Sequence, residues 1–516
     1  MVLMSSSSSF SSTRSRTRAQ AQAQAQQAQA QDTTRQDTGD MGTSTIDLLM
    51  LTFNCAQTLI NVPVFANQLQ AALNQDATGL GLPDLVVFSL QEVAPLAYSF
   101  VGGCFLNPYI TRFGDALNLA ALRFDDERSN ATSSDTQTAY QPKKPYGLVK
   151  AGNVGYTAIL LFARDPDRIK DLQEAEVGFG AADMGNKGAV GLRCLFEGEN
   201  DGGESELTFV ATHLAAMEWN LARRNANWAA IMRGMAFENP EVVVSEHRAS
   251  SAGRNSDNDD DGERQMLLHE EHNEEHQRLR RRLHDISIFK PSSHLFVAGD
   301  LNYRISSKSP PPGAAFPSLD PESQHYYMRF WPFDQLTREK GAGRTLHGLS
   351  EGVVKFAPTY KYVIKPGTKD SDENPAWSFA PHRYPSWTDR VLYLDAPRSA
   401  RPDKSVTVRA YDACPVLATS DHRAVFLRAS VPLISPADME RLLHEGGEAE
   451  DASDPRVRLP VELDPEAWER RAAARRREVM AGYSMMLWST RQGAILLGTI
   501  ALLGAGWYWF SSWRTD

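Results

Sequence analysis

Acid, amide and histidine side chains stand at the ends of several apolar runs in this chain. Residues 295–304 read LFVAGDLNYR, so an apolar run ends in Asp300 and Asn302. Successive side chains of an extended strand alternate between faces, so these two point to the same side. A carboxylate and a carboxamide side by side at the end of a buried strand can hold a water molecule and a divalent cation.

The same arrangement recurs along the sequence. LLMLTFN ends at Asn54, LVVFSLQE at Glu92 and LTFVATH at His213, and TSDHRAVFL carries Asp421 and His422 at the start of another apolar run. Strands whose tips bring together amide, carboxylate and imidazole groups are typical of a metal-assisted hydrolase. Each motif is weak alone, but together they predict such a site.

The composition narrows the class of protein. The chain has 516 residues, 42% of them hydrophobic, and a formal net charge of −10. This apolar content can bury a large core. Its four cysteines form no CxxC pair, which indicates a reducing compartment. Because phosphate contacts need a basic surface, the acidic balance argues against a nucleic-acid partner.

The chain divides into a polar lead and a folded region. Residues 1–43, with a serine run and an Ala-Gln alternation, predict a disordered lead. A catalytic domain is expected over 44–433, with a helical pattern at 215–235. Strand-like runs with helices between them favour a layered α/β sandwich. The strands are expected at 46–53, 84–90, 156–162, 188–196, 206–212, 294–299, 389–394 and 422–428.

Two polar stretches, about 124–144 and 245–278, interrupt the catalytic domain. The second is highly charged and could mimic a metal cluster, because it contains four histidines. No apolar framework orients these imidazoles, so we expect a solvated insertion loop there. The histidines are His247, His269, His272 and His276.

The pattern changes after about residue 434. Residues 434–484 predict a linker with an Arg-rich helical segment, WERRAAARRREV, and 485–516 an anchor region. The uncharged run 493–510 spans roughly 27 Å as a helix, close to the hydrocarbon thickness of a bilayer. Aromatic residues gather at the C-terminal end of this run and just after it, as in an interfacial belt. We expect a C-terminal tail anchor with the catalytic domain in the cytosol; the alternative is a buried core helix.

Further blocks identify a family. YPSWTDRVLYL at 384–394 places Asp389 and Arg390 just before a strand. Together with VAGDLNYRI and TSDHRAVF, it makes the chain resemble the inositol polyphosphate 5-phosphatases, which are magnesium enzymes. The GNKG loop of that family is matched at 185–188 and its PTYK block at 358–361. The resemblance implies a four-layer α-β-β-α sandwich of the DNase I-like type, followed here by the transmembrane helix.

The resemblance also assigns catalytic roles. Asp300 is expected to orient and deprotonate the attacking water, and Asn302 to hold that water or a phosphate oxygen. His422 is expected to donate to the phosphate, with Asp389 fixing its tautomer and keeping it protonated. His213 adds a second donor. Taken alone, His213 could instead be a core histidine, and Asp389 a surface ion pair.

Metal and substrate contacts follow in the same way. Glu92 and Asn54 offer oxygen ligands to Mg²⁺, and Asp421 is expected to support the metal or the water. The GNKG loop implies contact with the 1-phosphate side and the PTYK block with the 4-phosphate. Residues 380–382, Ala-Pro-His, depart from the usual Lys-containing run of the family. The expected substrate-binding residues are Asn186, Lys187, Tyr360, Lys361, Arg383 and Arg390.

The implied reaction is Mg²⁺-dependent hydrolysis of the 5-phosphate of phosphatidylinositol 4,5-bisphosphate to phosphatidylinositol 4-phosphate. The anchor resembles that of fungal tail-anchored phosphatases of the endoplasmic reticulum, so we expect the cytosolic face of that membrane. Two alternatives are a neutral sphingomyelinase-like phosphodiesterase of the same fold and a non-catalytic phosphoinositide-binding tether. The PSWTDR, GNKG and PTYK blocks argue against the first, and the intact polar residues against the second.

Overall fold

The computed structural model describes residues 44–75, 81–132, 144–199, 202–252, 262–397, 400, 404–445, 454–489 and 491–515. The expected lead over 1–43 lies outside the described residues. So do residues 133–143 of the first polar stretch and 253–261 of the second.

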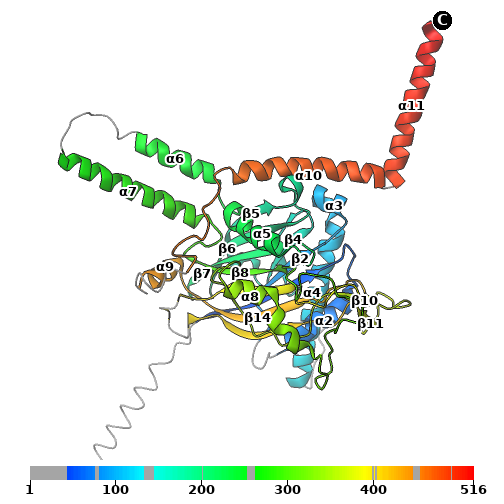
Figure 1. Cartoon of the computed structure of the whole chain (residues 1–516), viewed down its shortest axis with the longest axis horizontal. Helices are drawn as coiled ribbons and strands as arrows, with labels where there is room; N and C mark the ends of the chain where they lie inside the picture. Colours follow the sequence, from blue (N-terminus) through cyan, green and yellow to red (C-terminus); the bar gives the residue numbers. More distant parts are fainter. Residues whose placement is uncertain are drawn as a thin grey trace, which may run out of the picture. The chain divides into compact units, whose positions relative to one another are not determined.

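The first of two six-stranded sheets (Figure 1) carries the N-terminal strand at its centre. Strand β1 pairs in parallel with β2 and antiparallel with β14, and Asn54 lies opposite Gln91. The C-terminal ends of strands β1 and β2 therefore lie side by side. The strands run in the order β13 (Thr407–Ala413), β14 (Val425–Pro432), β1 (Thr45–Asn54), β2 (Leu85–Gln91), β4 (Thr157–Ala163) and β3 (Gly147–Val154).

The second sheet aligns three of the polar strand ends. Strand β7 runs parallel to β8 with His213 opposite Asp300, and β12 runs antiparallel to β8 with Asp389 opposite Asp300. A Cβ atom at Gly299 would lie 1.9 Å from the backbone oxygen of Thr212, so only glycine fits there. The order is β5 (Ile169–Gly178), β6 (Gly188–Glu197), β7 (Glu204–His213), β8 (Ser293–Asp300), β12 (Asp389–Leu394) and β9 (Ser350–Glu351).

Three apolar clusters stack the elements into four layers. Helices α2 (Val62–Asn74) and α4 (Asn107–Thr132) cover the outer face of the first sheet, where Phe65 and Phe113 pack edge to face. A second cluster fills the space between the sheets, and a third joins the second sheet to α5 (Leu221–Gly234) around Trp228. Each fully buried large side chain contributes about 1.5–3 kcal/mol. The expected four-layer α/β sandwich is confirmed.

The other elements connect these layers or extend from them. The short helices are α3 (Leu96–Val101), η1 (Gly103–Phe105), η2 (Pro166–Arg168), η3 (Ala181–Asp183), η4 (Tyr327–Phe333), α8 (Gln335–Gly341) and α9 (Pro436–Glu445). The longer ones are α6 (Pro240–Ala252), α7 (Gly262–Asp285), α10 (Ala467–Ser489) and α11 (Arg491–Thr515). A small hairpin pairs β10 (Tyr362–Ile364) with β11 (Trp377–Phe379).

The structure corrects two expectations about polar segments. The second polar stretch is largely helical where it is described, in α6 and α7, rather than a loop. Residues 467–489 are not a free linker either, because helix α10 packs against the sandwich with one side. Its buried residues recur at intervals of seven, four and four, which places them on one helical face. They are Ala467, Ala474, Glu478 and Gly482.

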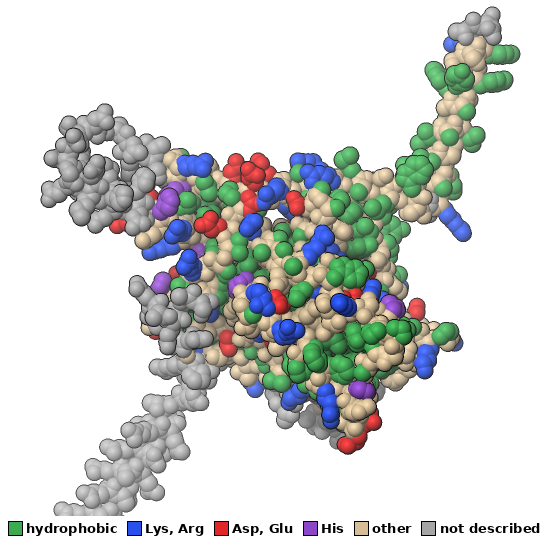
Figure 2. Space-filling view, in the orientation of Figure 1, with side chains coloured by type: hydrophobic (Ala, Val, Ile, Leu, Met, Phe, Trp, Pro, Cys, Tyr) green, Lys and Arg blue, Asp and Glu red, His purple; other side chains and the backbone are tan. Residues whose placement is uncertain are grey.

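Helix α11 has the properties expected of the membrane segment. Its stretch Gly493–Arg514 is long and apolar enough to cross a membrane, and almost none of it is buried. Leu502 and Trp507, for example, are about three-quarters exposed, at 76% and 75%. Hydrophobic side chains along this helix are visible in Figure 2. These features are compatible with the expected span over 493–510.

The side chain of Arg390 is buried and does not reach the catalytic groups. Its guanidinium donates to Glu351 Oε2 at 2.6 Å and to Asp334 Oδ2 at 3.1 Å, and it is 0% exposed. Side chains alternate along β12, so Asp389 and Arg390 point to opposite faces. The expectation that Arg390 binds substrate is therefore wrong; it joins β12 to β9 and to the start of α8.

We predict that Arg390→Ala lowers the free energy of unfolding by about 3–5 kcal/mol, because Asp334 and Glu351 would remain buried without their cation. Urea unfolding of the detergent-solubilised chain measures this loss. Arg409→Ala is the matched control, because Arg409 is exposed on β13, and it should cost about 0.5 kcal/mol or less. Equal losses in the two variants would contradict the structural role.

Candidate active site

The carboxylate of Asp300 lies at the centre of the converging strand ends. Asn54 Nδ2 donates to its Oδ2 at 3.2 Å, and His213 Nε2 lies 3.3 Å from the same oxygen. His422 Nε2 is 4.0 Å away. The backbone N–H of Asn302 donates to the other oxygen, Oδ1, at 3.0 Å. The structure thus brings together residues from both sheets that are far apart in the sequence.

The surroundings keep Asp300 ionised. Burial alone would raise its pKa, but the hydrogen bond from His213 and the nearby charges of His422 and Lys187 outweigh burial. The pKa of Asp300 is therefore held well below its usual range. At neutral pH this carboxylate is ionised, the state in which it can accept a hydrogen bond from a water molecule.

His422 and Asp389 form a buried pair beside Asp300. His422 Nδ1 donates to Asp389 Oδ2 at 2.9 Å, and the hydroxyls of Thr359 and Thr388 donate to the same oxygen at 2.7 and 2.8 Å. Burial would lower the pKa of His422, but the charge and hydrogen bond of Asp389 raise it to about 9. His422 is therefore a cationic donor at neutral pH, with Asp389 fixing its tautomer.

A second imidazole lies between a cation and the central carboxylate. The Lys187 ammonium contacts both ring nitrogens of His213, and its distance to Nδ1 is 3.2 Å. Burial, followed by the charge of Lys187, lowers the pKa of His213, so this ring is neutral. Lys187 comes from the GNKG loop, and burial lowers its own pKa. The loop therefore places its lysine beside His213 and close to the Asp300 carboxylate.

Arg304 and Tyr360 hold the groups around them in place. Arg304 is buried, its Nε donates to the Asn302 carbonyl at 3.0 Å, and its Nη2 contacts the Asn302 side-chain oxygen. The guanidinium also lies 4.4 Å from the Tyr360 ring centre, and that ring lies 4.5 Å from the ring of His422. Our sequence analysis gave Arg304 no role, although it stands in the GDLNYR block. It positions Asn302 and, through Tyr360, His422.

Glu92 and Asn54 fit a hard divalent cation. Asn54 ends β1 and Glu92 follows β2, and these two strands are parallel neighbours. Both side chains offer oxygen atoms. Glu92 has a left-handed backbone with φ of 47°, and Asn302 has φ of 57°, a conformation that is rare outside glycine. Such strain is common where a side chain must point into an active site. Gln57, which the sequence analysis did not select, donates to Glu92 Oε2 at 3.3 Å.

A third acidic residue has a different partner. Asp421 Oδ2 accepts from the Lys361 ammonium at 2.6 Å, and neither side chain is fully buried. We therefore assign Asp421 to the orientation of Lys361 rather than to the metal. Among the described residues, the acid and histidine atoms close enough to share an ion belong to Asp300, Asp389 and His422. Because the His422 ring already donates to Asp389, this cluster suits proton transfer better than metal binding.

In the part of the chain that the structure describes, two expected substrate contacts form no hydrogen bond with Asp300. Arg383 Nη1 pairs with Glu218 Oε1 at 3.2 Å, and its side chain is about one-fifth exposed, at 19%. The side-chain oxygen of Asn186 is buried without a hydrogen-bond partner among the described residues. Both residues stay predictions as substrate contacts.

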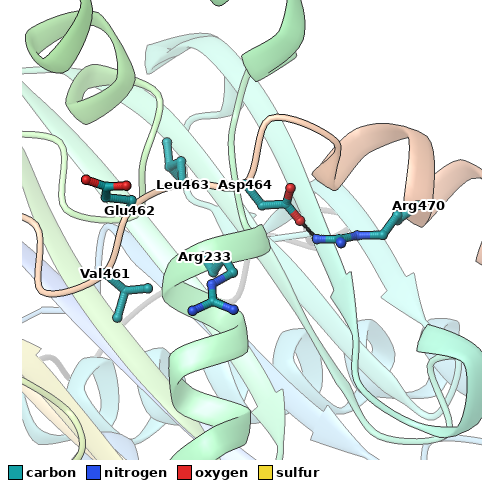
Figure 3. Close-up of a pocket in the computed structure, with 6 residues that line it drawn as sticks. All are labelled: Arg233, Val461, Glu462, Leu463, Asp464 and Arg470. Atoms are coloured by element: carbon teal, nitrogen blue, oxygen red, sulfur yellow. Dashed lines mark ion pairs between the residues drawn. The ribbon is translucent and has the colours of Figure 1, made fainter.

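A separate pocket of about 450 Å³ lies between α5 and the segment leading into α10 (Figure 3). Arg233 comes from α5, and Asp464 and Arg470 form the ion pair drawn in Figure 3. None of the catalytic candidates lines it, so we assign it no catalytic role. Its lining residues are Arg233, Val461, Glu462, Leu463, Asp464 and Arg470.

The chain is similar in sequence to known phosphatases. The sequence pattern of endonuclease/exonuclease/phosphatase family 2 matches residues 51–428. Polyphosphatidylinositol phosphatase INP53 of Saccharomyces cerevisiae is 27% identical over 372 residues, covering 70% of this chain and 25% of that protein. Type II inositol polyphosphate 5-phosphatase 14 of Arabidopsis thaliana is 30% identical over 274 residues, covering 50% and 20%.

The chain thus spans about a quarter or less of the length of these curated relatives. A solved inositol polyphosphate 5-phosphatase domain of SPsynaptojanin, in complex with inositol (1,4)-bisphosphate and calcium ion, is 20% identical, with a TM-score of 0.47. The similarity covers 78% of this chain and 89% of that one. The resemblance drawn from the sequence motifs is confirmed: this chain belongs to endonuclease/exonuclease/phosphatase family 2, and its curated relatives include a polyphosphatidylinositol phosphatase and a type II inositol polyphosphate 5-phosphatase.

Proposed function

We propose that this chain hydrolyses the 5-phosphate of phosphatidylinositol 4,5-bisphosphate in the presence of Mg²⁺ and leaves phosphatidylinositol 4-phosphate. The observation that carries the proposal is the pairing of an ionised Asp300 with a protonated His422, 4.0 Å apart. A base and a cationic donor at this separation can act on a water molecule and a phosphoryl oxygen at once. The names of the relatives support the choice of inositol phosphates.

In this reaction the residues divide the work by charge. Asp300 aligns a water molecule and takes its proton as the oxygen attacks phosphorus in line with the leaving group. The bond from phosphorus to the inositol 5-oxygen breaks, and this oxygen leaves as the alcohol with a proton from solvent. His422 donates to a phosphoryl oxygen, and Asp389 stabilises the imidazolium. Lys187, next to His213, adds positive charge where the phosphoryl group must lie.

Glu92 and Asn54 would hold the magnesium ion. When bound, Mg²⁺ supplies Lewis-acid stabilisation of phosphoryl and leaving-group oxygens. One carboxylate and one neutral amide leave net positive charge at such a site, which suits a phosphomonoester dianion.

Selection of the 4-phosphate would fall to Tyr360 and Lys361. Tyr360 offers a hydroxyl group, and Lys361 an ammonium that is partly exposed, at 28%. Asp421 accepts one hydrogen bond from the Lys361 ammonium and orients it, and the ammonium keeps further N–H groups for a phosphate. Arg383 is a further candidate contact to the same headgroup, and it is paired with the buried Glu218 at 3.2 Å.

Helix α11 would anchor the chain in a membrane, and we propose the cytosolic face of the endoplasmic reticulum. The length and exposure of its apolar stretch support a span. Anchoring confines enzyme and lipid to one surface, which raises their effective concentration relative to soluble inositol phosphates.

The function is tested by phosphate release from a panel of inositides by the full chain in detergent, with Mg²⁺ or with EDTA. We expect release from phosphatidylinositol 4,5-bisphosphate, loss of release in EDTA, and a product that retains the 4-phosphate. A product that retains the 5-phosphate would overturn the proposal. Hydrolysis of sphingomyelin would favour the phosphodiesterase, and lipid binding without turnover the tether.

Asp300→Asn should fold normally and still bind substrate, but lose at least about 10² in kcat, because it removes a positioned general base. His422→Ala should cost about as much, and adding Asp389→Ala should cost little more, because these two residues act as one unit. Steady-state kinetics on a short-chain lipid measure all of these changes. Near-normal turnover of Asp300→Asn would contradict its assignment.

Lys361→Ala should lower kcat/KM on the 4,5-bisphosphate by at least about tenfold, the range for losing a hydrogen bond to a charged group. The loss should be much smaller on phosphatidylinositol 5-phosphate, which lacks the 4-phosphate. Lys365→Ala, at an exposed position on the same segment, is the matched control. Equal losses of Lys361→Ala on both lipids would mean that Lys361 is structural or contacts the scissile group.

A chain ending at Ser489 keeps α10 and lacks α11. It should move from the membrane fraction to the soluble fraction while retaining activity on short-chain lipid. Fractionation must include a high-salt wash, because the arginines of α10 could bind anionic lipid by themselves. Retention in the membrane after that wash would place the anchor elsewhere.

A further inference from the structure

Helix α10 contacts one segment that carries a residue of the candidate active site and a second segment that follows such a residue in the chain (Figure 1). One is the GNKG loop over 185–188, which contains Lys187. The other is α3, which follows Glu92 in the chain. A helix expected to be part of a linker therefore contacts the loop that carries Lys187 and the helix that follows Glu92.

Glu478 makes the contact with the GNKG loop. Its side chain is fully buried, and its Oε1 accepts the backbone N–H of Gly185 at 2.7 Å. Arg471 donates to both carboxylate oxygens, at 2.6 and 2.9 Å, and also to Glu176 on β5 at 2.8 Å. Arg475 lies 3.6 Å from the second oxygen. Because the carboxylate is held by two arginines, its position is fixed when it receives the loop amide.

The GNKG loop is held on its other side by backbone. The Gly185 carbonyl accepts the N–H of Tyr156 at 3.3 Å, and a Cβ at Gly155 would lie 2.1 Å from that carbonyl oxygen. Gly155 also has φ of 49°, so both this close contact and the backbone conformation disfavour a side chain at this position. Gly185, which stands two residues before Lys187, is thus held on one side by the backbone that joins β3 to β4 and on the other by Glu478.

A second set of contacts fixes α10 on α3. Arg475 donates to the carbonyl oxygens of Phe100 and Val101 at 2.6 and 3.0 Å, which lie at the C-terminal end of α3. At Gly482 the two helices are in direct contact, because a Cβ there would lie 2.9 Å from the Ala97 carbonyl oxygen. Any larger side chain at Gly482 must move α10 outward.

We propose that Glu478 is a positioning residue for the reaction: it fixes Gly185 and thereby holds Lys187 against His213, so that α10 belongs to the catalytic unit. This inference rests on the proposed function, since it names a further residue of the same site. A displacement of about 1 Å at a catalytic group can cost as much as 10² in rate, so a fixed loop has direct kinetic value.

The test compares full-length variants in detergent with a short-chain phosphatidylinositol 4,5-bisphosphate. Glu478→Ala removes the acceptor for Gly185, whereas Glu478→Gln keeps an oxygen that can accept the same N–H. Glu469→Ala is the matched control, because it makes the same chemical change at an exposed position of α10. Gly482→Leu displaces α10 without touching Glu478, and Ala472→Leu, at an exposed position, is its control.

We expect Glu478→Ala to lower kcat per folded molecule by roughly tenfold to a hundredfold, with KM changed much less. Hydrogen exchange of the amides over 180–188 should become faster in the same variant. Glu478→Gln should recover most of the turnover even if it is less stable, and Gly482→Leu should resemble Glu478→Ala. The two controls should match the unmodified chain.

Two results would overturn the inference. The first is a Glu478→Ala variant whose folded fraction falls but whose kcat per folded molecule is unchanged, since this is the behaviour of a merely structural residue. The second is faster exchange over 180–188 with normal turnover. If the unmodified chain releases no phosphate, the proposed function fails instead, and exchange over 180–188 still reports whether Glu478 fixes the loop.

Discussion

The ionised carboxylate of Asp300, buried with 1% of its surface exposed, is the constraint on which the rest of the site depends. A buried charge without partners costs several kcal/mol, so the fold must surround it with donors. Asn54 ends β1 in one sheet, beside the end of the parallel strand β2. His213 ends β7 in the other sheet, beside the end of the parallel strand β8. The close approach at Gly299 lets β7 and β8 align at this end.

Two buried histidines beside this carboxylate have opposite charge states. His422 lies near three carboxylates, of which Asp389 has the largest effect, and they keep it protonated despite burial. His213 stays neutral, because burial and the charge of Lys187 outweigh the effect of Asp300. One is a cationic donor, and the other can carry a hydrogen bond between lysine and carboxylate without adding charge. Residue type alone could not assign these states.

The buried strands were predictable because they are apolar on both faces and read as continuous runs. Strands β3 and β5 were missed because they lie at sheet edges and carry charged residues, such as Lys150 and Glu174. The convergence at Asp300 followed from the strand ends. Arg390 was assigned to substrate because it stands beside Asp389 in a motif, yet the period of two along a strand already separates their faces. The helical segment of α10 was predicted, but its packing against the domain was not, because its buried face is small or charged, with Ala474, Glu478 and Gly482.

The docking of α10 bears on the proposed membrane anchoring. A flexible linker of about fifty residues would let the domain range over roughly 40 Å from its anchor. With α10 docked on the sandwich, only residue 490 separates the catalytic unit from α11, which begins at Arg491. The effective concentration at which the site meets membrane lipid rises as the linker shortens, provided that the geometry permits contact. On the proposed anchoring, the helix that contacts Gly185 would also limit how far the site can move from the bilayer, so the position of Lys187 and access to lipid would depend on one interface.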